Sequence, residues 1–109
     1  MAARAKMDKV MVGPNRPTAI FAVSDPGAWT ALQWLAERGI KVPAEVSFLG
    51  FDDDRHSQHV HPSLSTLRQP VKEMAQVVFQ LLAAPIRPGQ IQLLPPTLVI
   101  RKSTGRVPS

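Results

Sequence analysis

Continuous apolar runs predict two buried strands in the first half of the chain. Residues 18–23 (Thr-Ala-Ile-Phe-Ala-Val) and 46–51 (Val-Ser-Phe-Leu-Gly-Phe) contain mostly apolar side chains, without alternating polar ones. Such runs are typical of strands that are buried on both faces, as in a parallel sheet. Residues 25–38, between the runs, repeat apolar side chains at helical spacing. This order predicts a parallel, right-handed βαβ unit.

The helix of this unit has a recognisable start and an apolar outer side. Ser-Asp-Pro at residues 24–26 is a helix-start signature, since a side-chain oxygen accepts from free N–H groups and Pro fits the first helical position. We expect Asp25 to cap the helix and Gly39 to end it. The core face consists of Ala28, Ala31, Leu32 and Leu35. Trp34 points away from that face, so something beyond the sheet should cover the helix.

The remaining elements are short and are separated by Pro and Gly residues. We expect an amphipathic helix over residues 1–12, a short strand over 65–69 and a helix over 71–84. Two further strands are predicted over residues 91–94 and 97–100. Most of the 11 Pro residues fall between these segments.

Composition fits one globular domain and excludes several classes of protein. Of the 109 residues, 44% are hydrophobic and 19% are charged. The net charge of +5 comes from scattered basic residues, which favours a solvated surface over a nucleic-acid-binding stripe. The absence of Cys excludes disulfides and Cys-ligated metals, and no apolar run is long enough to span a membrane.

Three carboxylates, at residues 52–54, directly follow the second strand. The carboxyl edge of a parallel sheet is where open α/β folds bind ligands. Asp52 and Asp54 are compatible with an aspartyl phosphotransferase that uses Mg²⁺, but the Lys and Ser/Thr partners of such a site are not evident. A metal cluster is a second alternative, formed by His56, His59 and His61. Exposure in a polar loop explains these histidines more simply, so we predict neither a catalytic nor a metal site.

A specific series of short segments runs along the chain. The segments are residues 16–22 (Arg-Pro-Thr-Ala-Ile-Phe-Ala), 24–25 (Ser-Asp), 37–43 (Glu-Arg-Gly-Ile-Lys-Val-Pro), 46–53 (Val-Ser-Phe-Leu-Gly-Phe-Asp-Asp), 61–62 (His-Pro), 64–70 (Leu-Ser-Thr-Leu-Arg-Gln-Pro) and 98–104 (Leu-Val-Ile-Arg-Lys-Ser-Thr). In order and spacing they resemble the C-terminal part of the LacI/GalR family of bacterial transcriptional repressors. The resemblance covers nearly the whole chain.

The resemblance implies an α/β fold, a parallel-sheet βαβ lobe of a periplasmic-binding-protein-like fold that is a fragment of a two-lobed domain. Residues 1–109 would be the C-terminal portion of an effector-binding and dimerisation domain, with no helix-turn-helix in this chain. Gln69 and Pro70 would form a crossover between the lobes. The helix over residues 71–84 would belong to the other lobe, and its apolar face would lack the sheet on which it packs.

The resemblance also implies an effector site. Asp52 stands at the first Asp of the family's Gly-aromatic-Asp-Asp motif, which accepts hydrogen bonds from effector hydroxyls, a task that suits a carboxylate. Its alternative role is to cap the following turn. Ser24 stands where many family members carry a sugar-contacting Asn, and its shorter hydroxyl could act through water or could simply cap the helix. Gln69 would line the cleft between the lobes.

Other positions have different expectations. We expect Asp53 to cap a turn or to pair with a basic residue, and Asp54 to be solvated. Trp29 and Val60 lie where the family forms its dimer interface, although both could instead pack within the lobe. Trp34 could serve in either way.

The function implied is effector sensing and dimerisation in a LacI-type transcriptional regulator, without enzymatic activity or cofactor. The expected partners are a sugar or nucleoside-like polyol, a second copy of the chain, and operator DNA only through a headpiece absent from this chain. A cytoplasmic location without membrane contact follows from the same resemblance. A periplasmic sugar-binding protein of a transporter shares the fold and is the alternative, and an aspartate-based phosphotransferase is a third. The outer helix and the Arg-Lys-Ser-Thr ending favour the repressor.

Overall fold

The βαβ unit predicted from the apolar runs is present in the computed structural model, which describes residues 2–84 and 88–109. Strand β1 (Ala19–Phe21) leads into helix α2 (Asp25–Glu37), and the chain returns in strand β2 (Ser47–Leu49). The two strands are parallel, with Ile20 opposite Phe48. The side chain of Phe48 is buried in the hydrophobic core, where β2 packs against α2. The buried hydrophobic core consists of Met7, Met11, Ala28, Ala31, Leu32, Trp34, Leu35, Val46, Phe48 and Leu64.

Ser24, and not Asp25, caps α2. The backbone of Ser24 is extended (φ −152°, ψ 150°), and its Oγ accepts a hydrogen bond from the backbone N–H of Gly27 at 3.3 Å. This geometry is that of a helix N-cap, which satisfies one of the free N–H groups of the first turn. Asp25 lies inside the helix and is fully buried, so the prediction that Asp25 caps the helix was wrong.

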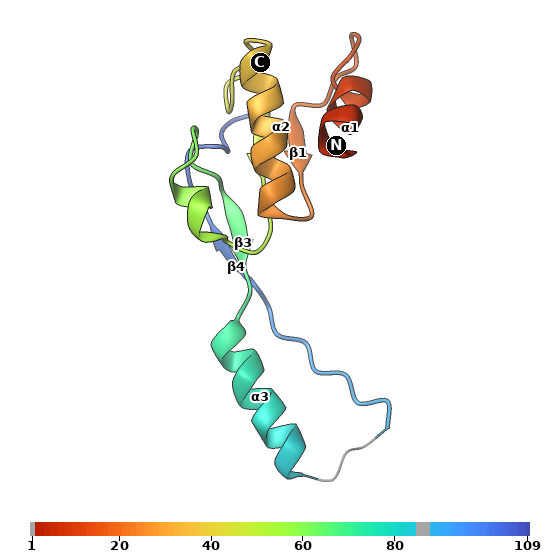
Figure 1. Ribbon diagram of the computed structural model, residues 1–109, viewed down its shortest axis with the longest axis vertical. Helices are drawn as coiled ribbons and strands as arrows, with labels where there is room; N and C mark the ends of the chain where they lie inside the picture. Colours follow the sequence, from red (N-terminus) through yellow and green to blue (C-terminus); the bar gives the residue numbers. More distant parts are fainter. Residues whose placement is uncertain (1, 85–87) are drawn as a thin grey trace.

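Helix α1 (Ala2–Val10) lies beside α2 (Figure 1) and packs against the side of α2 that carries Trp34. Trp34 is only 3% exposed, and its Nε1 donates to Asp8 Oδ1 at 2.8 Å. The guanidinium carbon of Arg38 lies 3.7 Å from the centre of the Trp34 ring, a cation–π arrangement. The expectation that something beyond the sheet covers this helix is therefore confirmed, and the cover is α1 of the same chain.

A second pair of strands forms its own two-stranded sheet beside the first. Strands β3 (Thr66–Arg68) and β4 (Thr97–Val99) are antiparallel, and a parallel bridge between Leu49 and Ser65 connects β2 to the start of β3. A short 3₁₀ helix, η1 (Arg55–Gln58), lies between β2 and β3. The strand predicted over residues 91–94 is absent. Ile91 and Leu93 are 82% and 86% exposed, and no described strand lies beside them to supply backbone partners.

Helix α3 (Val71–Ala83) projects away from this lobe, and the chain returns to the lobe at β4 (Figure 1). The helix contains no buried residue, and Phe79 and Leu82 are 75% and 76% exposed. An apolar helix face of this kind normally packs on another element. The prediction that the apolar face of this helix lacks its sheet is therefore confirmed for the described residues.

Candidate functional site

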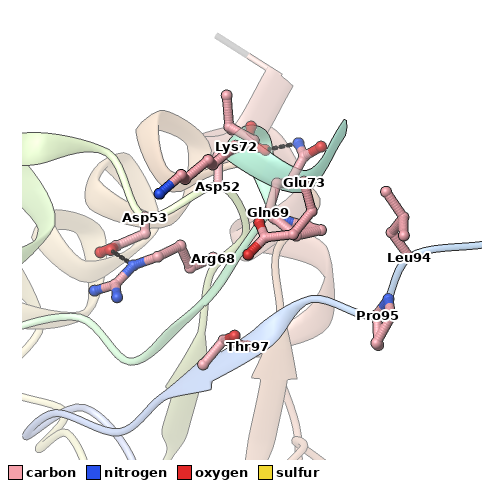
Figure 2. A pocket seen from close by; sticks show the side chains of 11 residues that line it. Asp52, Asp53, Arg68, Gln69, Lys72, Glu73, Leu94, Pro95 and Thr97 are labelled. Atoms are coloured by element: carbon pink, nitrogen blue, oxygen red, sulfur yellow. Dashed lines mark hydrogen bonds and ion pairs between the residues drawn. The ribbon is translucent and has the colours of Figure 1, made fainter. Parts of the chain in front are cut away.

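An open pocket of about 670 Å³ lies where the chain leaves β3 for α3 (Figure 2). The segment just before β4 forms its other side. We call it the crossover pocket, and its polar lining consists of Asp52, Asp53, Arg68, Gln69, Lys72, Glu73 and Thr97. The structure therefore brings two of the predicted effector residues, Asp52 and Gln69, into one pocket.

Asp52 and Gln69 contact each other directly. The Nε2 of Gln69 donates to Asp52 Oδ1 at 2.5 Å, and the Asp52 side chain is otherwise exposed. A carboxylate has about four lone-pair sites, so most of the acceptor capacity of Asp52 faces the pocket. The amide oxygen of Gln69 adds another acceptor. Together they form a small surface of acceptors that suits a ligand rich in hydroxyl groups.

The backbone holds Asp52 in a strained conformation. Its φ is 104° and that of Asp53 is 54°, both in the region that favours glycine. The N–H of Asp52 donates to Leu67 O at 2.9 Å, and that of Asp53 donates to Thr66 Oγ1 at 3.3 Å. These two hydrogen bonds to β3 hold the strained backbone of Asp52 and Asp53, and we call these two residues the acidic turn. Strain of this kind is concentrated at ligand-binding sites, where it fixes the direction of a side chain.

Asp53 pairs with two arginines and so has a structural role. Its Oδ2 accepts from Arg68 Nε at 2.8 Å, shown in Figure 2, and its Oδ1 accepts from Arg101 at 2.7 Å. Burial raises the pKa of Asp53, but the hydrogen bonds and charges of Arg101 and Arg68 together outweigh it and leave the pKa below its ordinary value. The prediction that Asp53 pairs with a basic residue is confirmed.

The prediction that Asp54 is solvated was wrong. Asp54 is half-buried, and its Oδ1 accepts from the backbone N–H of His56 at 3.1 Å, which caps η1. One of its two carboxylate oxygens is therefore engaged as a helix cap. The correction follows from the 3₁₀ helix, which the sequence pattern did not reveal.

Asp25 is the polar residue whose role the sequence did not show. It is fully buried, and its Oδ1 accepts from Thr66 Oγ1 at 2.8 Å. Its Oδ2 accepts from the Ser57 hydroxyl at 2.5 Å and from the Asp54 N–H at 2.7 Å. The sequence contains one signal of this buried carboxylate, which is Gly50. Any larger residue at that position would occupy the space of the Asp25 carboxylate. Asp25 thus joins α2, η1 and β3 behind the acidic turn.

Ser24 lies apart from the crossover pocket. It lines a separate, mainly apolar hollow of about 360 Å³ between α1 and β1, beside Met7 and Phe48. Its hydroxyl is engaged as the cap of α2. Its predicted contact with an effector, direct or through water, stays a prediction.

Trp29 and Val60 both contact their own lobe. The Nε1 of Trp29 donates to Ser57 Oγ at 3.1 Å, and its ring meets that of His56 edge-on with the centroids 5.6 Å apart. Val60 packs partly buried against the core. These contacts leave part of each side chain exposed. Their predicted place in a dimer interface stays a prediction.

The three histidines after the acidic turn do not form a metal cluster. Within residues 2–84 and 88–109, no three His, Cys, Asp or Glu side chains converge closely enough to hold an ion. None of the helices in these ranges is long enough and apolar enough to cross a membrane.

Comparison with known proteins identifies the family. The family described as "Periplasmic binding protein-like domain" matches residues 1–104. The chain belongs to this family. Among curated proteins, the HTH-type transcriptional regulator DegA of Bacillus subtilis (strain 168) is 42% identical over 95 residues, 84% of this chain and 28% of DegA.

Solved structures agree with this assignment. A LacI transcriptional regulator from a Rhodococcus species superposes with a TM-score of 0.83 at 31% identity, over 98% of this chain and 41% of that one. A LacI family regulator from Lactobacillus casei, solved with bound sucrose, gives a TM-score of 0.72 at 28% identity over 94% and 39%. The resemblance to LacI-type regulators is thus confirmed. The chain spans about a third of the length of the curated relatives it matches.

Proposed function

We propose that residues 1–109 form the C-terminal portion of the effector-binding and dimerisation domain of a LacI-type transcriptional regulator. The observation that carries the proposal is the pairing of Asp52 with Gln69 in the crossover pocket. The acidic turn holds the Asp52 carboxylate in a strained backbone conformation with its remaining acceptor positions exposed. A site prepared in this way suits ligand binding, because little ordering remains to be done when the ligand arrives.

The effector that fits this chemistry is a sugar or a nucleoside-like polyol. Hydroxyl groups donate, and both Asp52 and Gln69 offer acceptor oxygens. Glu73 adds another carboxylate, and the positive charges of Arg68 and Lys72 keep the pocket from being strongly acidic. The bound sucrose of the Lactobacillus casei regulator supports a polyol as the class of ligand.

The mechanism that follows is a population shift between two arrangements of lobes. Gln69 lies at the point where the chain leaves one lobe for α3. A ligand held by Asp52 and Gln69 would therefore favour one arrangement of the two lobes over the other. In the complete protein, a homodimer in the cytoplasm, this bias would change the spacing of two DNA-binding headpieces. Trp29 and Val60 would contribute to contacts between subunits, and operator DNA would be bound only through the headpieces.

The regulator is favoured over a periplasmic sugar-binding protein, although both share the fold. The relatives described above are transcriptional regulators, and the similarity extends over nearly all of this chain. The packing of α1 against α2 does not by itself distinguish a regulator from a periplasmic sugar-binding protein. The relatives and the placement of Asp52 together support sensing without catalysis.

Calorimetry on the intact protein tests the effector site. Sugars and nucleosides would be titrated into the wild type, into Asp52→Ala and into Gln69→Ala. Loss of hydrogen bonds to a charged acceptor costs about 1.5–3 kcal/mol, so we expect Asp52→Ala to weaken binding roughly 10- to 150-fold. Glu37→Ala is the matched control, because it removes an exposed carboxylate on α2, outside the crossover pocket, whose salt bridge with Arg4 lies at the surface. A ligand that binds Asp52→Ala as tightly as the wild type would show that the site is assigned wrongly.

A further inference from the structure

We infer that Asp25 is a positioning residue that couples the acidic turn of the crossover pocket to the surface around Trp29. The connection is a continuous series of hydrogen bonds through two hydroxyl groups, which we call the Asp25 relay. It consists of the Asp53 N–H, Thr66, Asp25, Ser57 and the Trp29 indole. The inference rests on the proposed function only in taking Asp52 as the effector residue and Trp29 as a subunit contact.

The pocket end of the relay is Thr66. Its Oγ1 accepts from the Asp53 N–H at 3.3 Å and donates its single proton to Asp25 Oδ1 at 2.8 Å. The N–H that it holds belongs to the second residue of the acidic turn, whose positive φ must be maintained by its surroundings. The position of Asp25 therefore determines where the backbone that carries the Asp52 carboxylate is held.

The opposite end of the relay is Ser57 in η1. Its Oγ accepts from Trp29 Nε1 at 3.1 Å and donates its single proton to Asp25 Oδ2 at 2.5 Å. Ser57 and Asp25 are both fully buried, whereas Trp29 is partly exposed. A displacement of the acidic turn can therefore reach a side chain on the outer surface through groups that water does not contact.

The chemistry of the relay makes the two ends interdependent. A hydroxyl has one proton, so each of Thr66 and Ser57 must direct it to Asp25 while accepting from its other neighbour. In the described part of the chain, no buried side-chain polar atom lacks a partner. If the Thr66 hydroxyl turned away, Oδ1 of Asp25 would lose its donor. If the Ser57 hydroxyl turned away, Oδ2 would lose that donor but keep the Asp54 N–H. Coupling between sites is reciprocal, and a change at either end should therefore be detected at the other.

The ¹H–¹⁵N signal of the Trp29 indole in the intact protein, without effector, tests the relay from the pocket end. Its assignment comes from the signal lost in Trp29→Phe. Thr66→Val keeps the shape of the side chain but removes the hydroxyl. We expect it to shift the Trp29 indole signal and to leave that of Trp34, which donates to Asp8, unchanged. Thr66→Ser, which restores the hydroxyl, should return the Trp29 signal to its wild-type position.

Ser103→Ala is the control matched for burial. Ser103 is also fully buried, but its hydroxyl contacts Phe48 O and the Ser65 N–H, outside the relay. An unchanged Trp29 signal in Thr66→Val, or an equal shift in Ser103→Ala, would overturn the inference. If Thr66→Val does not fold, Ser57→Ala reads the relay in reverse, and the expected result is a shifted amide signal of Asp53. An unchanged Asp53 amide would overturn the inference.

The test separates failure of the relay from failure of the proposed function. The indole and amide shifts are measured without effector, so they do not depend on the identity of the ligand. The calorimetric comparison of wild type with Asp52→Ala, in contrast, does not depend on Trp29. If the indole shift is observed but Asp52→Ala binds polyols as tightly as the wild type, the inference about Asp25 stands and the assignment of the effector site is wrong.

Discussion

A β-carbon added at Gly50 would lie 2.3 Å from Oδ1 of Asp25 and 2.8 Å from the side chain of Leu64. Both distances are shorter than any real contact, and both neighbours are fully buried. Gly50 does not have a positive φ, so its role is to leave space and not to permit an unusual backbone. The glycine that precedes Phe51 and Asp52 is therefore required by the buried carboxylate of another element.

Gly50→Ala should consequently destabilise the lobe. The methyl group would displace the Asp25 carboxylate from Thr66 and overpack the core against Leu64. Overpacking costs about 1–3 kcal/mol, and a displaced acceptor that leaves a buried donor unsatisfied costs a similar amount. We expect a loss of about 2–4 kcal/mol in the free energy of unfolding, measured by urea denaturation.

Gly39→Ala is the comparison for the Gly50 experiment. Gly39 has φ +68° and nothing within 4 Å of an added β-carbon, so its substitution tests backbone strain alone and should cost about 1 kcal/mol. A double-mutant cycle of Gly50→Ala with Asp25→Ala should show less than additive losses, since removal of the carboxylate relieves one clash. Strictly additive losses would contradict the contact.

Asp52→Gly should be more stable than Asp52→Ala by about 1 kcal/mol. Both variants lose the carboxylate and its bond to Gln69, but only Gly adopts φ 104° without strain. Both should lose effector binding to a similar extent. Urea denaturation compares their stabilities, and calorimetry compares their affinities. Equal stabilities would show that the backbone at this position is not strained.

Much of the fold could be predicted because it depends on local pattern. Apolar runs and helical spacing were sufficient to predict β1, α2 and β2. The apolar face of α3 indicated that this helix lacks the sheet on which it would pack. The segment over residues 91–94 has an equally apolar pattern but forms no strand. A strand needs a neighbour to pair with, and pattern alone does not supply one.

The candidate site was only partly accessible from the sequence. Asp52 and Gln69 were predicted to line the same cleft, and the structure places them in contact. Asp25 was mistaken for a helix cap because its partners, Ser57 and Thr66, are 32 and 41 residues distant in the chain. Such contacts depend on how the elements pack, which local capping rules do not describe.

The pairing of Asp53 with Arg101 and Arg68 should make the lobe sensitive to acid. The pKa of Asp53 is lowered from its ordinary value of 3.8, so the folded chain binds this proton less readily than the unfolded chain. The stabilisation is therefore present above pH 3.8 and is lost as the pH falls through the lowered pKa. In Asp53→Asn, the free energy of unfolding should depend less on pH over this acid range. The same slope in both proteins would contradict the assignment.

The two arginines that pair with Asp53 should contribute unequally. The Arg101 side chain is 17% exposed and also donates to Leu64 O, whereas that of Arg68 is 58% exposed. Arg101→Gln should lower the free energy of unfolding by about 1–3 kcal/mol, since it leaves buried acceptors without their donor. Arg68→Gln should change it by less than about 1 kcal/mol, as for exposed ion pairs. Urea denaturation at neutral pH distinguishes them, and an equal loss in the two variants would contradict the difference in burial.

The exposed apolar face of α3 predicts that one substitution has different effects on stability in two forms of the protein. Phe79→Ser should leave the stability of the isolated 109-residue chain unchanged within about 0.5 kcal/mol, because this side chain makes no buried contact there. It should also reduce self-association of that chain, measured by sedimentation. In the complete protein, where we propose that the other lobe covers α3, the same substitution should cost about 3–5 kcal/mol, as for loss of a buried Phe. The buried Leu35 is the control, since Leu35→Ala should destabilise both forms. Equal, small effects of Phe79→Ser in both forms would show that α3 is not covered in the complete protein.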